Sequence, residues 1–71
     1  MSERIEADQV ASVREITVTL GDEVHAGDTV LVLEAMKLRI PVQARTTGTV
    51  AEVDVAPGDV VQEGDLLAVI A

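Results

Sequence analysis

The sequence predicts an all-β fold, a flattened barrel or sandwich of about eight short antiparallel strands, on the strength of three observations. Valine accounts for 13 of the 71 residues, and Phe, Tyr and Trp are absent; β-branched side chains suit a pleated, half-buried surface. The chain aligns with itself at a shift of 37 residues. No window shows the helical period of apolar residues. We therefore expect one all-β domain that spans residues 1–71.

The internal repeat aligns residues 11–33 with residues 48–70 without a gap. Nine of these 23 aligned pairs are identical, among them Gly21 with Gly58 and Asp22 with Asp59. A unit that is too small to bury its apolar face alone must pack against another. The two copies should therefore form two four-stranded sheets related by a pseudo-two-fold axis.

Each copy predicts the same succession of strands. Val13 and Ile16 are three residues apart, as are Val50 and Val53. An odd spacing changes the face of the strand, so we expect a β-bulge or bend at this place in both copies. The residues that follow, 16–20 in the first copy, alternate apolar and polar and are expected to continue the strand.

The pattern Gly-Asp-x-Val-x-x-Gly-Asp then occurs at residues 21–28 and 58–65. It predicts two tight turns that frame a very short strand, because glycine supplies a positive φ and aspartate can bond its own backbone nearby. Calcium loops place several oxygen ligands within about a dozen residues, a pattern that is missing here. Each copy closes with an apolar strand, residues 29–33 or 66–70.

Composition excludes several classes of function. A formal charge of −8 and the lack of aromatic side chains disfavour nucleic-acid binding. The longest apolar run, residues 30–33, is too short to span a bilayer, and the N-terminus lacks a secretory signal, so the default location is cytoplasmic. His25 is the sole histidine and is expected at the surface. No catalytic triad or metal-ligand pattern is visible, and the chain looks non-catalytic.

Lys37 is the only lysine of the chain and lies between the two copies. Residues 34–39 link the last strand of the first copy to the first strand of the second, so they should form a hairpin. The counterpart of this hairpin in the repeat falls where the chain begins and ends. Lys37 should therefore project from one end of the domain, with both termini at the other end.

The segment Glu34-Ala35-Met36-Lys37-Leu38 resembles the attachment motif of biotin carboxyl carrier proteins, in the biotin/lipoyl attachment family. The resemblance extends over nearly the whole chain and implies a flattened barrel with the lysine on an exposed hairpin. It also implies that Lys37 carries covalent biotin, while Ala35, Met36 and Leu38 are read by a biotin protein ligase and Glu34 completes the motif. The chain looks most like the short, free-standing members of the family.

The function implied by this resemblance is that of a non-catalytic carrier. A biotin carboxylase would load the biotin with a carboxyl group, and a carboxyltransferase would pass this group to an acceptor, commonly an acyl-CoA as in fatty acid biosynthesis. A lysine amine is almost fully protonated near neutral pH, so a ligase must position and deprotonate it. We expect the isolated domain to be monomeric.

The sequence departs from the family pattern at three places. Leu38 replaces the usual methionine, Arg39 stands where an acidic residue is common, and the Pro-Met-Pro-Gly stretch before the first strand is missing. The gap-free repeat leaves no room for the additional thumb loop of some carriers. Two alternatives remain: a lipoyl carrier, which usually has Asp-Lys-Ala at the modified lysine, and an unmodified barrel that acts as an interaction module.

Overall fold

The computed structural model describes residues 2–71 and contains eight strands, with no helix in that part of the chain. Most strands are short, as expected for a small β-sandwich. Their bounds are β1 Glu3–Glu6, β2 Ala11–Ile16, β3 Glu23–Val24, β4 Thr29–Ala35, β5 Leu38–Gln43, β6 Gly48–Val53, β7 Val60–Val61 and β8 Leu66–Ile70.

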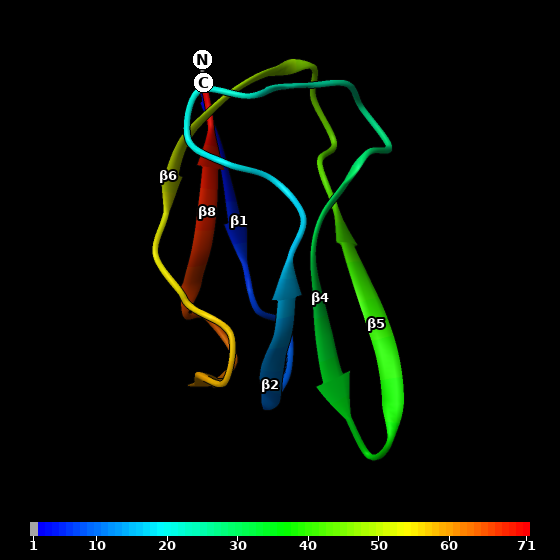
Figure 1. The fold of residues 1–71 in the computed structure, drawn as a ribbon. Helices are drawn as coiled ribbons and strands as arrows, with labels where there is room; N and C mark the ends of the chain where they lie inside the picture. Colours follow the sequence, from blue (N-terminus) through cyan, green and yellow to red (C-terminus); the bar gives the residue numbers. More distant parts are fainter. Residues whose placement is uncertain (1) are drawn as a thin grey trace.

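The strands form two four-stranded antiparallel sheets, in the orders β1-β8-β6-β3 and β5-β4-β2-β7 (Figure 1). The shift of 37 residues carries each strand of one sheet onto its counterpart in the other, which confirms the pseudo-two-fold arrangement and the predicted fold class. However, a sequence copy does not correspond to a sheet. Each sheet takes two strands from each copy, so the halves interlock rather than stack as separate units.

Both predicted bulges are present. The register shifts between Val13 and Glu15 in the pairing of β2 with β4, and between Val50 and Glu52 in the pairing of β6 with β8. The predicted continuation of the strand over residues 17–20 is wrong, because β2 ends at Ile16. Of residues 17–20, only Val18 packs against the core, and the chain then enters a turn.

All four Gly-Asp pairs close β-turns of one type. The glycines have φ between 90° and 96° and stand third in their turns, as a type II turn requires. The aspartate side chain that follows accepts a hydrogen bond from the backbone N–H three residues earlier, at 2.8–2.9 Å in all four turns. Pro57 occupies the second position of one turn, and Pro41 lies in the edge strand β5.

These turns also join the two sequence copies. Val50 donates its N–H to Asp22 O and accepts from Gly21 N–H, both at 2.9 Å. The same two-bond pattern recurs at three other places, where Val13 pairs with Gly58 and Asp59, Ala44 with Gly27 and Asp28, and Ala7 with Gly64 and Asp65. Each of the four Gly-Asp turns therefore bonds to a residue of the other sequence copy and stabilises that copy.

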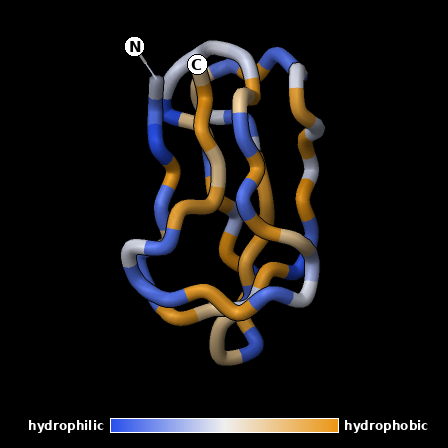
Figure 2. Tube along the Cα trace, turned by 90° about the vertical axis from the view of Figure 1, so that its left-hand side faces the viewer, coloured by the Kyte–Doolittle hydropathy of each residue, from blue (hydrophilic) through white to orange (hydrophobic). Residues whose placement is uncertain are grey.

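The core between the sheets is entirely aliphatic. The largest fully buried side chains are Leu31, Leu33, Leu67, Ile70, Val13, Val30 and Val50. No polar or charged residue among residues 2–71 is buried. Hydrophobic and hydrophilic residues alternate along the strands, as the tube in Figure 2 shows, so one face of each sheet points inward.

The β4–β5 hairpin extends past the rest of the sandwich at one end, and both chain ends lie at the other (Figure 1). The molecule is elongated, with extents of 32 × 18 × 18 Å. This arrangement agrees with the position predicted for Lys37.

Candidate functional site: an exposed hairpin lysine

Lys37 lies in a two-residue turn between β4 and β5. Ala35 and Leu38 form the last pair of the ladder, and Met36 and Lys37 connect them. Both turn residues have positive φ, 53° for Met36 and 65° for Lys37. Positive φ at both central residues is characteristic of a type I′ turn, whose twist matches that of the flanking strands. Such turns prefer Asn and Gly, so these two residues hold an unfavourable backbone conformation.

The turn presents its side chains to solvent. Met36 is 94% exposed and Leu38 is 67% exposed, while Lys37 is also exposed. Only Ala35 packs against the core. Core filling is therefore excluded for Met36. An exposed methionine beside an exposed leucine forms an adaptable apolar surface on both sides of the lysine.

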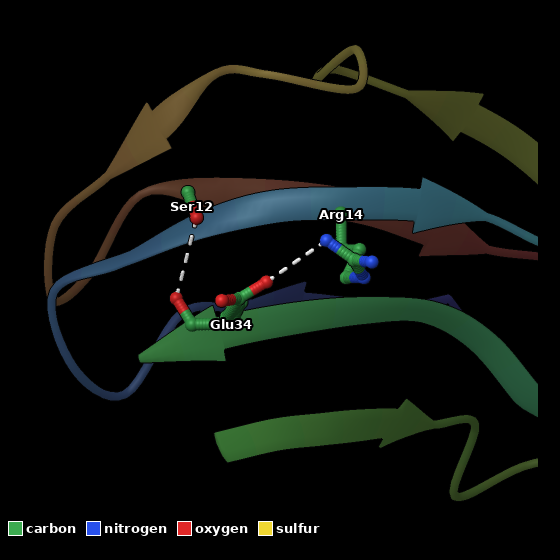
Figure 3. A network of polar contacts seen from close by, with 3 residues as sticks. All are labelled: Ser12, Arg14 and Glu34. Atoms are coloured by element: carbon green, nitrogen blue, oxygen red, sulfur yellow. Dashed lines mark hydrogen bonds and ion pairs between the residues drawn. The ribbon is translucent and has the colours of Figure 1, made fainter. Parts of the chain in front are cut away.

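Glu34 is tied to the neighbouring strand β2 (Figure 3). Its carboxylate oxygen Oε1 accepts a hydrogen bond from Arg14 Nη1 at 3.1 Å. Its backbone carbonyl accepts a weaker bond from Ser12 Oγ at 3.4 Å. The motif thus begins at a residue of β4 that is bonded to the neighbouring strand β2, shortly before the turn of the β4–β5 hairpin.

Sequence reasoning missed the role of Arg14. Arg14 is the additional residue of the bulge in β2, and its counterpart in the repeat is Ala51. A charged residue at the bulge of only one copy, the copy that leads to the lysine, was a signal that the sequence offered. What could not be known was that a bulge would direct this side chain toward Glu34.

Arg39 lies directly opposite Glu34 in the β4–β5 ladder and is exposed. Among residues 2–71, however, the ion pairs join Arg14 to Glu34, Arg4 to Glu6 and His25 to Asp28, and none includes Arg39. Glu34 therefore forms its ion pair on the side away from Arg39.

The other candidate positions do not form a second site. The His25 ring lies 3.8 Å from Asp28 and is three-quarters exposed. Over residues 2–71, no group of three or more His, Asp or Glu side chains is placed to hold a metal ion, and no helix could cross a membrane. A hollow of about 750 Å³ lies between the edge strands β1 and β5, but no residue of the segment Glu34–Leu38 lines it.

Comparison with known proteins defines the class of this protein: residues 2–70 match the family model described as "Biotin-requiring enzyme", and the chain belongs to this biotin/lipoyl attachment family. Domains of this family are carriers and not catalysts. Among its relatives is the "Biotinylated protein TB7.3 homolog" of Mycobacterium leprae, which is 49% identical over the full length of both chains. The protein of the same name from Mycolicibacterium smegmatis is 53% identical over 99% of both chains.

Solved structures give the same fold. The chain is 35% identical to part of the Kluyveromyces lactis urea carboxylase, with a TM-score of 0.94 over 100% of this chain and 6% of the carboxylase. A single-chain long-chain acyl-CoA carboxylase matches with a TM-score of 0.88 and 34% identity, over 96% of this chain and 7% of that chain. The lipoyl domain of the Azotobacter vinelandii 2-oxoglutarate dehydrogenase complex matches at 0.78 over 94% of this chain and 95% of that chain, but at 23% identity it shows the fold alone.

These matches confirm the predicted family and fold, and biotin as the cofactor class that the family requires. The hairpin fits that group, because an amide on Lys37 needs an accessible amine with free space around it. The exposed turn meets this requirement.

Proposed function

We propose that this protein is a biotin carboxyl carrier and that Lys37 is its single attachment point. The observation that supports the proposal most directly is the position of the only lysine, in an exposed turn at one end of the sandwich. Similarity to relatives named as biotinylated proteins agrees with it.

The chain contributes position rather than reactivity. A biotin protein ligase joins the biotin carboxylate to the AMP portion of ATP, and pyrophosphate leaves. The amine of Lys37 then attacks this acyl-adenylate: an amide forms to Nζ, AMP leaves, and the original ammonium group has lost two protons. Nothing in the hairpin is placed to remove these protons: the carboxylate of Glu34, the nearest acidic residue in the sequence, is bound to Arg14. The ligase must therefore supply the base.

Bound biotin supplies a ring nitrogen that can hold a carboxyl group. We propose that the domain presents this group first to a biotin carboxylase and then to a carboxyltransferase, with an acyl-CoA as the acceptor. The matched carboxylases are named for urea, for long-chain acyl-CoA and for pyruvate. Because one domain type serves all three, the acceptor is selected by the carboxyltransferase. The ATP requirement is consistent with a cytoplasmic location.

Intact mass and streptavidin blotting after co-expression with a biotin protein ligase test the proposal. The wild-type protein should gain one biotinyl group, and Lys37→Arg should gain none. Arginine keeps the charge and the exposed position, so the melting temperature should change by less than about 2 °C, as is usual for a surface substitution. A folded wild-type protein without biotin would disprove the carrier function.

Two further experiments test the lipoyl alternative and the proposed carboxylase partners. Incubation with a lipoate ligase tests the lipoyl alternative, because the shared fold does not distinguish the two groups. Capture on streptavidin from the native host, followed by identification of the co-purified subunits, tests the carboxylase partners. Recovery of a dehydrogenase complex in place of a carboxylase would contradict the assignment.

A further inference from the structure

The internal repeat allows the two sheets to be compared position by position. Sheet β5-β4-β2-β7 carries Arg14 and Arg39, whereas the corresponding positions of the other half are Ala51 and Ser2. Lys37 has no counterpart in the repeat. Three of the five Lys and Arg residues of the chain therefore lie on this sheet or in its hairpin turn, and none of them has a basic counterpart in the repeat, although the molecule has a formal charge of −8.

Within this group, Arg14 and Arg39 compete for one carboxylate. Glu34 lies between them, paired across the ladders with Arg39 of β5 on one side and with Ser12 of β2 on the other. Its side chain forms the ion pair with Arg14 at 3.1 Å. In the described part of the chain Arg39 consequently has no ion-pair partner, although a carboxylate-bearing residue stands directly opposite.

An exposed and unpaired guanidinium favours an external carboxylate. Arginine binds carboxylates with two parallel N–H groups and keeps its charge at all physiological pH values. Biotinylation removes the charge of Lys37 but leaves Arg39 unchanged. Because the surrounding molecule is acidic, Arg39 marks a local site for an acidic protein surface and not for nucleic acid.

The enzyme that must contact this residue is the one that modifies the lysine. To form the amide, a ligase has to bring Lys37 Nζ within bonding distance of its activated substrate, so its surface must enclose the turn. Arg39 is two residues from Lys37 on the same hairpin, so we expect it to lie inside that contact area. A carboxylase instead reaches the cofactor at the end of a long arm.

We propose that Arg39 is a specificity-determining residue for biotinylation: it binds a carboxylate on the biotin protein ligase, and Arg14 keeps it available by holding Glu34. This inference rests on the proposed carrier function. Electrostatic contacts of this kind act mainly on the rate of association and on partner choice, so the effect should appear in kcat/KM and should depend on salt.

The test measures biotinylation of the intact protein by the ligase of the same organism, with saturating biotin and ATP. Arg39→Glu should lower kcat/KM by about tenfold or more at low ionic strength, because attraction becomes repulsion. The defect should shrink markedly between about 0.1 M and about 1 M salt, as the Debye length falls from about 10 Å to about 3 Å. Arg39→Lys should keep most of the activity, and Arg14→Gln should show a smaller defect in the same direction.

Arg4→Glu is the matched control, since Arg4 lies on the other sheet, is similarly exposed and changes the net charge equally. It should alter kcat/KM by less than about twofold. Equal defects for Arg4→Glu and Arg39→Glu, or normal labelling of Arg39→Glu, would overturn the inference while leaving the carrier function intact. Failure of the ligase to label the wild-type protein at any salt concentration would overturn both. Melting temperatures of all variants show whether a defect arises from unfolding.

Discussion

At the scale of single residues, the site combines exposure with an unfavourable backbone conformation. Met36 and Lys37 both adopt the left-handed region that asparagine and glycine occupy more easily. The side chain of Met36 contributes little packing in compensation, because it is 94% exposed. Its presence in the turn is therefore better explained by recognition than by stability, which is the usual relation between strained residues and functional sites.

Substitution Met36→Asn should consequently stabilise the domain while impairing its modification. Asparagine tolerates the left-handed region, so the free energy of unfolding should rise by about 0.5–1 kcal/mol. For a domain of this size that corresponds to an increase in Tm of about 2–8 °C by calorimetry. Biotinylation by the ligase should slow, because the methionine surface is lost.

Met36→Ala is the control for this experiment. It removes the same side chain but has no preference for a positive φ. If Met36→Ala stabilised the domain as much as Met36→Asn, the gain would come from removing an exposed apolar side chain, and the backbone explanation would be wrong.

At the scale of elements, the repeat provides an internal comparison for the turns. The turn at residues 56–59 has Pro57 in its second position, and the equivalent residue of the first copy is Leu20. Leu20 is 63% exposed, and its backbone N–H takes no part in the backbone hydrogen bonds of the turns within residues 2–71. The four turns share their glycine conformation and aspartate bond, so the proline of one should suit another.

Leu20→Pro should therefore raise the free energy of unfolding by about 0.4–1 kcal/mol, mainly by restricting the unfolded chain. Chemical denaturation at an unchanged m-value measures the gain. Ala26→Pro, at the same position of the next turn, should fail to stabilise, because Ala26 N–H donates to Thr47 Oγ1 at 3.2 Å. Stabilisation by both substitutions, or by neither, would show that the hydrogen bond does not decide the outcome.

At the scale of the whole molecule, the repeat explains both what the sequence predicted and what it did not. A gap-free repeat with glycine at fixed positions specifies turns, bulges and the place of Lys37, because these depend on local chemistry. It does not specify which copy pairs with which, since Val13 and Val50 could each have bonded the turn of either copy. Nor does it reveal the Arg14–Glu34 ion pair, which depends on the direction of one bulge.

Because each sheet takes two strands from each copy, neither half should be stable alone. Val50 of the second copy bonds the first turn of the first copy, and Val13 does the reverse, while both side chains lie in the common core at 1–2% exposure. Removing apolar volume from either position should therefore destabilise both halves equally. Val13→Ala and Val50→Ala should each lower the free energy of unfolding by about 2 kcal/mol in one cooperative transition.

Native-state hydrogen exchange distinguishes this behaviour from independent halves. In each variant, the most protected amides of β4 and β8 should lose the same amount of protection, although these strands belong to different copies. Loss confined to the copy that carries the substitution would mean that the halves unfold separately and that the cross-copy bonds contribute little. Met36 and Lys37 should exchange faster than β4 or β8 in all variants, because these turn residues lie outside the β4–β5 ladder. Lys37 would then be mobile enough to enter a ligase while the sandwich that carries it stays folded.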